Sequence, residues 1–303
     1  MGGISAVFGN EASTESACLG TGGGDFLLKQ ELQRCLQAFP LDVPGWKMRE
    51  VLHNSDNAVI FLAENAQGFF AVIKRFKFAV QDVDRARVER FLLGCHALRL
   101  LGQQQGLVRL LDAGINHQAI YLVMEYVRGD TLKNHLAASP LPPLSQRLRW
   151  FDELVAVLGM VHSAGLLHRD LKTSNILVRE AGSLALLDFG IETALLVEAG
   201  FLRVDEIYCT PYYVSPERIL GDMADERSDL YALGVILYEL LVGHKPYDSV
   251  VLSELLKKHM LAPIPRLPPR YSAYQPLVDG LLAKSPEDRL QSTDEVVCLL
   301  HGL

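Results

Sequence analysis

Four polar side chains in the middle of the sequence could together transfer a phosphate group. Asp170, Lys172 and Asn175 lie within six residues of one another, and Asp188 follows thirteen residues after Asn175. Phosphoryl transfer from ATP needs a base near the attacking hydroxyl, oxygen ligands for Mg²⁺ and positive charge near the phosphates. Asp170 is therefore the candidate base and Lys172 the candidate cation. Asn175 and Asp188 carry the oxygen atoms that Mg²⁺ prefers.

The residues between Asn175 and Asp188 predict a β-hairpin. Residues 175–178 form a short apolar run, residues 180–183 suit a turn, and residues 184–187 form a second apolar run. A hairpin brings the start of its first strand and the end of its second strand to the same end. Asn175 and Asp188 should then meet one metal cluster.

Both motifs resemble those of a known family. His168-Arg169-Asp170-Leu171-Lys172-Thr173-Ser174-Asn175 is similar to the catalytic loop of Hanks-type protein kinases, and Asp188-Phe189-Gly190 to their metal-binding motif. The resemblance is to bacterial serine/threonine kinases, because tyrosine kinases do not place a lysine two residues after the aspartate. It implies an α+β, two-lobed kinase fold, and ATP and Mg²⁺ as cofactors. A β-rich N-lobe would span residues 46–127 and an α-helical C-lobe residues 128–300.

The composition agrees with such an enzyme and argues against other classes. The 303 residues are 49% hydrophobic, which is enough for two lobes with their own cores, and the net charge of −7 gives no sign of a nucleic-acid surface. The five cysteines are widely spread without C-x-x-C spacing, which favours a reducing compartment over a disulfide framework or a zinc site. We expect a cytoplasmic protein without a membrane span, since the longest apolar run, residues 231–242, is too short.

The N-terminal region should lie outside the kinase domain. Residues 1–24 are rich in glycine and serine, which predicts a disordered tail. Residues 25–39 place apolar side chains at helical spacing, so residues 25–45 are interpreted as a helical extension. That helix could pack on its own domain or dock to a partner protein.

Lys74 ends an apolar run, residues 69–74, that predicts a buried strand. In the kinase family a lysine that ends an Ala-Val-Ile-Lys strand pairs with the α- and β-phosphates, and the resemblance carries this role to Lys74. By the same resemblance, the nucleotide-binding positions of the N-lobe are Leu52, Ala71, Lys74, Met124, Glu125 and Val127. Met124 would guard the back of the adenine pocket, and backbone groups of Glu125 and Val127 would bond the adenine edge.

The hairpin that should cover the phosphates departs from the family. Its three glycine positions hold His53, Ser55 and Ala58, and Asp56 adds negative charge. Bare glycine backbone lets a loop approach phosphates closely, whereas side chains crowd them. The resemblance therefore gives the place of this loop without implying tight binding of nucleotide.

The expected acidic partner of Lys74 is also displaced. The family places a glutamate on the helix that follows, predicted here over residues 82–101, but the usual spacing falls on Leu93. Glu89 lies one helical turn earlier on the same face. Either the helix is shifted so that Glu89 reaches Lys74, or the ion pair is absent.

Residues 188–217 resemble the activation and substrate-docking segment of protein kinases. Small-molecule phosphotransferases of related fold lack this segment, so the resemblance favours protein substrates. Thr193 and Thr210 are its candidate regulatory residues, and Arg169 beside the candidate base suggests control by a phosphate there. Regulation by autophosphorylation is one hypothesis, and the alternative is that Glu192, Glu198, Asp205 or Glu206 pairs with Arg169 instead.

Three charged residues in the C-lobe match structural positions of the family. Asp229 corresponds to the buried aspartate that holds the catalytic-loop backbone, and Glu217 and Arg289 to a buried ion pair. The sequence as a whole predicts an ATP-dependent protein serine/threonine kinase. The alternative is a pseudokinase scaffold with weak or no catalysis, suggested by the altered hairpin and the displaced glutamate.

Overall fold

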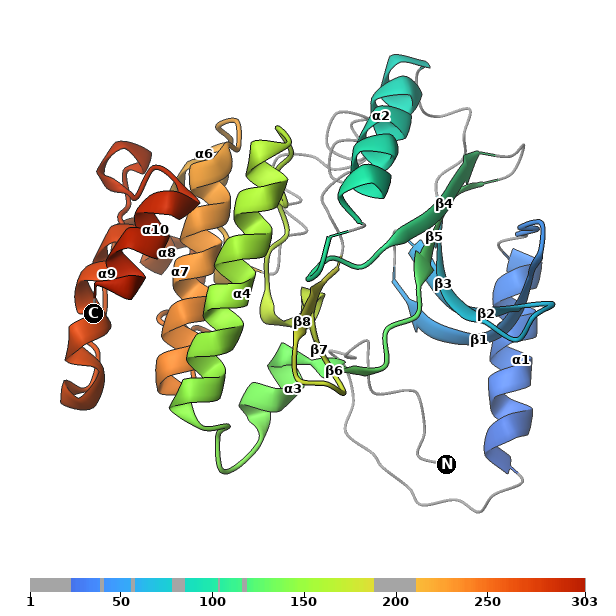
Figure 1. Ribbon diagram of the computed structural model, residues 1–303, viewed down its shortest axis with the longest axis horizontal. Coiled ribbons are helices and arrows are strands. Elements are labelled where there is room, and N and C mark those ends of the chain that lie inside the picture. The colour runs from blue at the N-terminus through green and yellow to red at the C-terminus, as the bar shows by residue number, and fades with distance from the viewer. Residues whose placement is uncertain are drawn as a thin grey trace. The chain divides into compact units, whose positions relative to one another are not determined.

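The computed structural model describes residues 23–38, 41–55, 58–77, 85–102, 104–115, 119–187 and 211–302 (Figure 1). The chain divides into two compact units. The first comprises residues up to 103 together with 108–129, and the second comprises residues 104–107 and 130–303. The change from one to the other at Gly129 lies close to the predicted lobe boundary between residues 127 and 128.

The first unit is built on a five-stranded antiparallel sheet in the order β1-β2-β3-β5-β4. The strands are β1 (Trp46–Asn54), β2 (Ala58–Asn65), β3 (Phe70–Phe76), β4 (Leu110–Ile115) and β5 (Ile120–Glu125). Residues 58–63 and 71–76 are buried without alternation, since both faces of β2 and β3 are covered. Because both faces are covered, these two strands are mostly apolar and do not alternate apolar and polar residues.

Helix α1 (Gly23–Ala38) packs against β1 in the first unit, as Figure 1 shows. Its Cys35 is 4% exposed and shares a core with Val43, Val59 and Phe61. The helix begins two residues before the predicted start at residue 25 and takes in Gly23 and Gly24, which the sequence predicts as part of the disordered tail. Glycine destabilises a helix chiefly in its interior, and both of these glycines lie in the first turn. This packing favours the helix as part of its own unit.

Helix α2 (Arg85–Leu101) matches the C-terminal part of the helix predicted over residues 82–101, whose first residues lie outside the described part. Its buried side chains are Phe91, Cys95 and Leu98, at helical spacing. Phe91 meets Phe76 of β3 edge to face, with ring centroids 6.3 Å apart. The helix packs against β4.

One predicted strand is displaced. The sequence predicts a strand over residues 107–112, but β4 begins at Leu110. Leu107 instead forms an isolated parallel bridge with Leu186 of the second unit. The chain turns before it at Gly106, which has φ of +92° and lies so close to the Val157 side chain that a Cβ atom would collide with it. Both features require glycine. The apolar run is thus shared between two sheets.

The second unit is mainly helical. Its α-helices are α3 (Leu132–Ala137), α4 (Leu144–Ser163), α6 (Pro216–Leu220), α7 (Glu226–Val242), α8 (Leu252–Leu261), α9 (Gln275–Leu281) and α10 (Thr293–His301). Its short 3₁₀ helices are η3 (Thr173–Asn175), η4 (Pro211–Tyr213), η5 (Pro269–Tyr274) and η6 (Pro286–Asp288). No helix in the described residues is long and apolar enough to cross a membrane.

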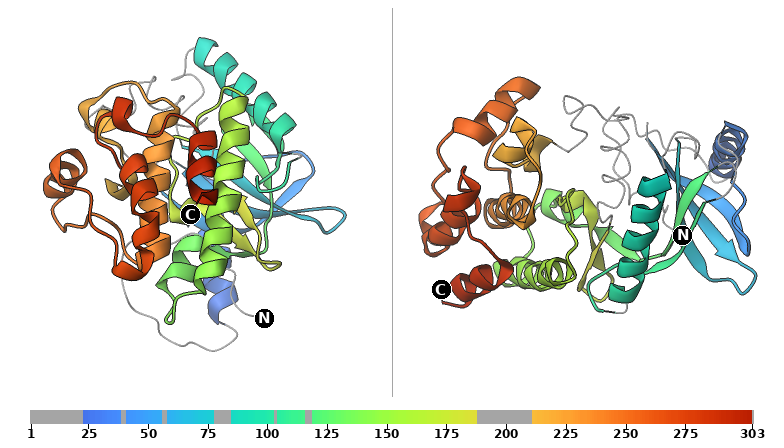
Figure 2. Two further views of the ribbon diagram at one scale, coloured as in Figure 1. Left: turned by 60° about the vertical axis from the view of Figure 1, so that its left-hand side comes forward. Right: turned by 90° about the horizontal axis from the view of Figure 1, so that it is seen from above.

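Helix α7 is the centre of this unit. Residues 228–241 are all buried, because α4 and α9 pack against the helix (Figure 2). A helix that is apolar on every side belongs in a core. Asp225 caps its first turn by accepting a hydrogen bond from the Arg227 N–H. At its other end, the buried Arg147 of α4 donates to the carbonyls of Leu240 and Leu241.

A small sheet in the order β6-β7-β8 lies beside these helices. Its strands are β6 (Gly129–Thr131), β7 (Ile176–Arg179) and β8 (Leu184–Leu186). β7 and β8 form the hairpin predicted from the sequence, with Ile176 opposite Leu186. The segment between α4 and β7 carries the candidate catalytic residues.

Candidate active site

Asp229 of α7 holds the start of the catalytic loop. Its carboxylate is 3% exposed and accepts hydrogen bonds from the backbone N–H groups of His168, at 2.7 Å, and Arg169, at 2.8 Å. The His162 ring lies 3.0 Å from the same carboxylate. Burial opposes ionisation of Asp229, but the hydrogen bond to His162 and the contacts with His168 lower its pKa below the ordinary value. The role predicted for Asp229 is confirmed.

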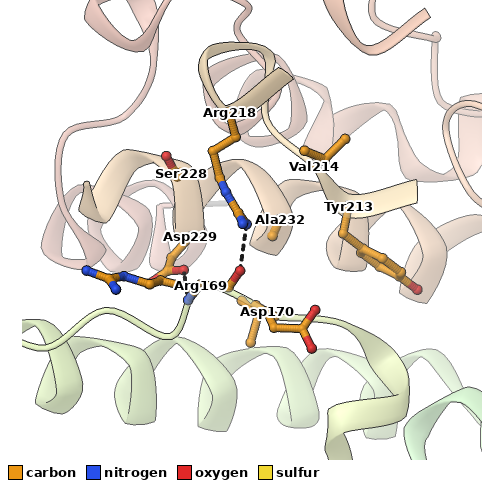
Figure 3. A pocket seen from close by; sticks show the side chains of 9 residues that line it. Arg169, Asp170, Tyr213, Val214, Arg218, Ser228, Asp229 and Ala232 are labelled. Carbon is orange, nitrogen blue, oxygen red and sulfur yellow. Dashed lines mark hydrogen bonds between the residues drawn. The ribbon is translucent and has the colours of Figure 1, made fainter. Parts of the chain in front are cut away.

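The loop passes through one unusual backbone conformation. Arg169 has φ of +65°, the left-handed region, in which a non-glycine side chain is strained. On one side its N–H donates to Asp229, and on the other its carbonyl accepts a hydrogen bond of 2.6 Å from Arg218 Nη1. Figure 3 shows Arg218 reaching from α6 to this carbonyl, in a pocket that Asp170 also lines.

Asp170, Lys172 and Asn175 come together as predicted. Lys172 Nζ lies 2.8 Å from Asp170 Oδ2. Asn175 Nδ2 donates to Asp170 Oδ2 at 3.0 Å and to the Asp170 carbonyl at 2.9 Å. The Asp170 carboxylate is partly exposed, with 30% of its side chain accessible. One of its oxygens is thus fixed by an amide and an ammonium group.

The hairpin places the residue before Asp188 against Asn175. The Leu187 N–H donates to the Asn175 carbonyl at 2.8 Å, and the Leu187 carbonyl lies 2.8 Å from His168 Nε2. His168 is fully buried and so ties the catalytic loop to the end of β8. Asp188 itself lies outside the described residues, as do Thr193 and Thr210.

Tyr213 takes part in a chain of hydroxyl contacts that the sequence did not indicate. Tyr213 Oη lies 2.9 Å from Thr173 Oγ1 and donates to Glu239 Oε2 at 2.6 Å. Burial, followed by the negative charge of Glu239, raises the pKa of Tyr213 well above its ordinary value, so the hydroxyl keeps its proton. Lys245 Nζ approaches Glu239 Oε1 at 3.5 Å. This chain joins the catalytic loop to α7.

The predicted ion pair between Glu217 and Arg289 is confirmed. Both terminal guanidinium nitrogens of Arg289 lie 2.9 Å from the Glu217 carboxylate, and Ser228 Oγ donates to it at 2.7 Å. Burial works against the charged form, yet the hydrogen bonds and the charge of Arg289 lower the pKa of Glu217 to about 2. The pair anchors α6 immediately before Arg218.

The nucleotide-binding positions predicted in the first unit lie on neighbouring strands. Lys74 is 7% exposed and stands on β3 between Ile60 of β2 and Leu122 of β5. Its Nζ lies 6.0 Å from the centre of the Phe76 ring. A lysine so placed in a sheet core is no ordinary surface cation.

The remaining predicted positions border the same strands. Ala71 is fully buried and pairs with Glu125, while Met124 is half-buried and pairs with Val72. Val127 is buried after the end of β5, and Leu52 is half-buried on β1. The Glu125 N–H donates to the Arg109 carbonyl at 2.9 Å, and so that N–H already has a partner.

The β1-β2 turn closes on itself. The Ser55 N–H donates to the Ala58 carbonyl at 3.0 Å, and the Ala58 N–H donates to Ser55 Oγ at 3.3 Å. Two of the positions that hold glycine in the family therefore bond to each other. Asp56 lies outside the described residues.

Glu89 lies on the exposed side of α2. Leu93, one turn further on, is 68% exposed, whereas Phe91, Cys95 and Leu98 form the buried side. Leu93 and Glu89 thus share a side of the helix, as the sequence predicted. The pairing of Glu89 with Lys74 stays a prediction.

The donor set of the catalytic loop fits a divalent cation. Asn175 uses its amide nitrogen for Asp170, so its side-chain oxygen Oδ1 faces elsewhere and can serve as a ligand. An amide oxygen together with carboxylates suits Mg²⁺ better than soft metals. Among the described residues, no group of three or more His, Cys, Asp or Glu side chains could hold a metal ion. The predicted second ligand, Asp188, is outside that part.

Comparison with known proteins decides the family. The family model of the protein kinase domain matches residues 56–298. The chain belongs to the protein kinase family. The predicted α+β, two-lobed kinase fold and the resemblance to Hanks-type bacterial serine/threonine kinases are confirmed. Membership implies the use of ATP and a divalent metal ion in general.

The curated relatives include several bacterial kinases. The chain is 29% identical to serine/threonine-protein kinase PrkC of Bacillus subtilis, over 83% of this chain and 39% of the relative. It is 31% identical to the probable serine/threonine-protein kinase PknB of Lactococcus lactis, over 74% and 36%. It is 34% identical to PknL of Mycobacterium tuberculosis, over 68% and 52%. The chain thus spans about a third to a half of their length, and their names give the pseudokinase alternative no support.

Proposed function

We propose that this protein is a serine/threonine kinase that transfers the γ-phosphate of ATP to hydroxyl groups of protein substrates. The observation that carries the proposal is the geometry of Asp170, fixed by Lys172 at 2.8 Å and by Asn175 at 3.0 Å on a loop suspended from Asp229. Such an arrangement orients a hydroxyl and stabilises the charge that develops during transfer.

Each residue of the loop has a defined part in the proposed reaction. Both contacts of the Asp170 side chain use Oδ2, so we assign the other oxygen, Oδ1, to the substrate hydroxyl. The hydroxyl oxygen bonds to the γ-phosphorus, the bond between that phosphorus and the β,γ-bridging oxygen breaks, and ADP leaves. Asp170 accepts the hydroxyl proton, while Lys172 offsets negative charge on the transferred group.

The residues of the first unit are assigned to the nucleotide. Lys74 would contact the α- and β-phosphates, with Leu52, Ala71 and Met124 around the adenine. Backbone groups of Glu125 and Val127 would bond the adenine edge. The Glu125 N–H already donates to the Arg109 carbonyl, so it is not among the groups assigned to this contact.

We propose Mg²⁺ as the divalent ion, held by Asn175 Oδ1 and by Asp188. When bound, the ion neutralises phosphate charge and aligns the γ-phosphate with the hydroxyl. The hard oxygen donors favour Mg²⁺ over zinc or copper. A cytoplasmic location would supply both ATP and Mg²⁺, and the spread of the cysteines is consistent with it.

Protein substrates are proposed from the segment over residues 188–217, which small-molecule phosphotransferases of related fold lack. Thr193 and Thr210 within it are proposed sites of autophosphorylation, with Arg169 as the cation that would pair with the phosphate. Incubation with ATP followed by peptide mass spectrometry tests this. Absence of phosphate at both threonines would remove this part of the proposal.

The test of the function is transfer of labelled γ-phosphate to a generic basic protein, followed by identification of the phosphorylated amino acids. The proposal predicts phosphoserine and phosphothreonine, dependence on added Mg²⁺ and no phosphotyrosine. The Asp170→Asn variant is the matched control, because the amide keeps the shape of the side chain without its basicity. Transfer to tyrosine alone, or equal transfer by the variant, would contradict the assignment.

A further inference from the structure

Arg218 directly follows the buried Glu217. The ion pair between Glu217 and Arg289 fixes the helix but does not account for the contact that the Arg218 side chain makes. Its side chain is half-buried and makes a single hydrogen bond in the described part of the chain, from Nη1 to the carbonyl of Arg169. That bond joins residues 49 positions apart. An arginine held to a backbone carbonyl at 2.6 Å makes a short, charge-assisted contact.

The carbonyl that Arg218 holds belongs to the peptide unit linking Arg169 to Asp170. The N–H of the same peptide unit donates to the His168 carbonyl at 2.9 Å. The peptide plane that leads into Asp170 is therefore fixed on both edges. Rotation of this plane would swing the start of the Asp170 side chain, since the two share the Asp170 nitrogen and Cα.

The backbone conformation of Arg169 needs contacts on both sides to hold it. Arg169 has φ of +65°, and a strained backbone conformation persists only where the surroundings over-determine it. Asp229 restrains the preceding N–H groups of His168 and Arg169, but makes no contact with the peptide unit beyond them in the described residues. Arg218 supplies the restraint on the Asp170 side. Figure 3 shows both contacts converging on Arg169 from α6 and α7.

The base of the Arg218 side chain is itself firmly placed. Glu217 is locked to Arg289 by two hydrogen bonds of 2.9 Å and to Ser228 by one of 2.7 Å. The short helix α6 thus has a fixed position in the second unit. Through Arg218 it transmits that position to the catalytic loop.

We infer that Arg218 is a positioning residue for Asp170, which sets the orientation of the candidate base from the end of the substrate-docking segment. The inference rests on the proposed kinase function and deepens it. It makes Arg218 act on the rate of transfer rather than on nucleotide binding, because its contact is to the backbone of the catalytic loop. It also predicts that only a cationic donor of sufficient reach can replace it.

The test compares Arg218→Met, which keeps the apolar stem, and Arg218→Lys, which keeps a shorter cation. We expect kcat to fall about 10- to 100-fold in Arg218→Met, as loss of one charge-assisted hydrogen bond in a site implies, with KM for ATP changed by less than about twofold. Arg218→Lys should recover part of the loss. Arg227→Met is the control, since Arg227 pairs with Asp225 at 2.7 Å outside the catalytic loop.

Two further readouts separate positioning from a general defect. Added guanidinium at a concentration that leaves the fold intact should partly restore kcat in Arg218→Ala but not in Asp170→Asn. Hydrogen exchange of the peptide over residues 166–176 should be faster in Arg218→Met than in the native chain or in Arg227→Met. This measurement needs no activity, so it tests the inference even if the native chain transfers no phosphate.

Unchanged kcat together with unchanged exchange in Arg218→Met would overturn the inference and leave the proposed function standing. Equal losses in Arg218→Met and Arg227→Met, with no rescue by guanidinium, would also overturn it. If Arg218→Met does not fold, Arg218→Lys decides: a lower kcat together with faster exchange over residues 166–176 than in the native chain supports the inference, and native values of both overturn it. If the native chain transfers no phosphate, the kinase proposal is refuted, and the exchange measurement still decides the inference about Arg218.

Discussion

The second unit positions Asp170 through a succession of side-chain hydrogen bonds, whereas the first unit places Lys74 through a strand and its packing. Asp229 and Arg218 bond to the backbone of the catalytic loop, and Lys172 and Asn175 contact the Asp170 side chain, each at 3.0 Å or less. Each such contact depends on one residue type at one position. The first unit presents mostly backbone groups and apolar side chains, for which many residue types suffice.

This difference explains where the chain keeps the family pattern and where it departs from it. A carboxylate that must accept a proton cannot be replaced without loss of chemistry. A loop that covers phosphates with its backbone can change its side chains and lose affinity only. Under the proposed function, Ser55 and Ala58 in place of glycine should therefore change the strength of nucleotide binding, whereas changes in the catalytic loop should change the rate of transfer.

The largest effect within the first unit is expected at Lys74, the one side chain of that unit to which the proposal gives a charged role. Lys74→Met keeps the buried apolar stem and removes the ammonium group. We expect phosphate transfer to fall by at least about 100-fold, because the charge on the α- and β-phosphates loses its partner. Lys47→Met, at an exposed position of β1, is the control and should transfer at the native rate. Full activity of Lys74→Met would show that the first unit does not work as proposed.

The next effect is expected at Glu217, which should make the free energy of unfolding of the second unit depend on pH. Glu217 has a folded-state pKa of about 2 against an ordinary value of 4.5. Since the folded pKa is depressed, its stabilisation is fully present above pH 4.5 and disappears as the pH falls towards 2. The pKa difference corresponds to about 3 kcal/mol of unfolding free energy. Urea unfolding of Glu217→Gln between about pH 2 and pH 7 measures it.

Glu217→Gln should be less stable than the native chain near neutral pH and should lose less stability as the solution is acidified. Leaving Arg289 buried without its partner makes the loss at neutral pH about 3 to 5 kcal/mol. The control is Glu254→Gln, at a surface pair with Lys257 in which the glutamate is 55% exposed. If both variants show the same pH profile as the native chain, the buried pair does not carry this stability.

Residues of the second unit differ in how far the sequence could predict their roles. The roles of Asp229, Glu217 and Arg289, and the meeting of Asp170 with Asn175, follow from motifs with fixed spacing. The contacts of Arg218 and of Arg147 do not, because their partners are backbone carbonyls 49 and 93 residues away. A carbonyl belongs to every residue, and so no residue type marks it in the sequence. Arg147 leaves one hint, because it stands at helical spacing before the buried Trp150, Phe151 and Leu154 of α4.

The run over residues 107–112, which begins in the second unit and continues in the first, shows the same limit in another form. The apolar run over residues 107–112 predicts one strand, but Leu107 pairs with Leu186 and only Leu110 and later residues join β5. Apolar runs indicate burial without naming the neighbour that buries them. The glycine at position 106, with its positive φ, is the local sign of a turn just before the run.

A smaller effect is expected at Asp56, in the turn between β1 and β2. Asp56→Gly removes a negative charge and a side chain from the loop that the resemblance assigns to the phosphates, so we expect ATP to bind about three- to tenfold more tightly. Asp56→Asn keeps the bulk and removes the charge, and its affinity should lie between the two. Isothermal titration with a non-hydrolysable ATP analogue measures all three. Unchanged or weaker affinity of Asp56→Gly would contradict this explanation of the turn.

The smallest effect is expected at Ser215 in Ser215-Pro216-Glu217, a run that resembles the Ala-Pro-Glu motif of protein kinases with serine in place of alanine. Ser215 is fully buried, and its hydroxyl has no hydrogen-bond partner in the described part of the chain. Ser215→Ala should raise the unfolding free energy by up to about 1 kcal/mol, because an unsatisfied buried hydroxyl is removed. Ser228→Ala is the contrasting control, since that hydroxyl donates to Glu217 and its loss should destabilise. Destabilisation by Ser215→Ala would mean that the hydroxyl has a structural role.

The division of work between the two units is tested most directly by following nucleotide binding and phosphate transfer together in the native chain and in Asp170→Asn. We predict saturable transfer by the native chain as ATP is raised. In Asp170→Asn, transfer should fall about 10²- to 10⁴-fold while nucleotide affinity stays close to native. Nucleotide binding without transfer by the folded native chain, or transfer by Asp170→Asn at the native rate, would contradict it.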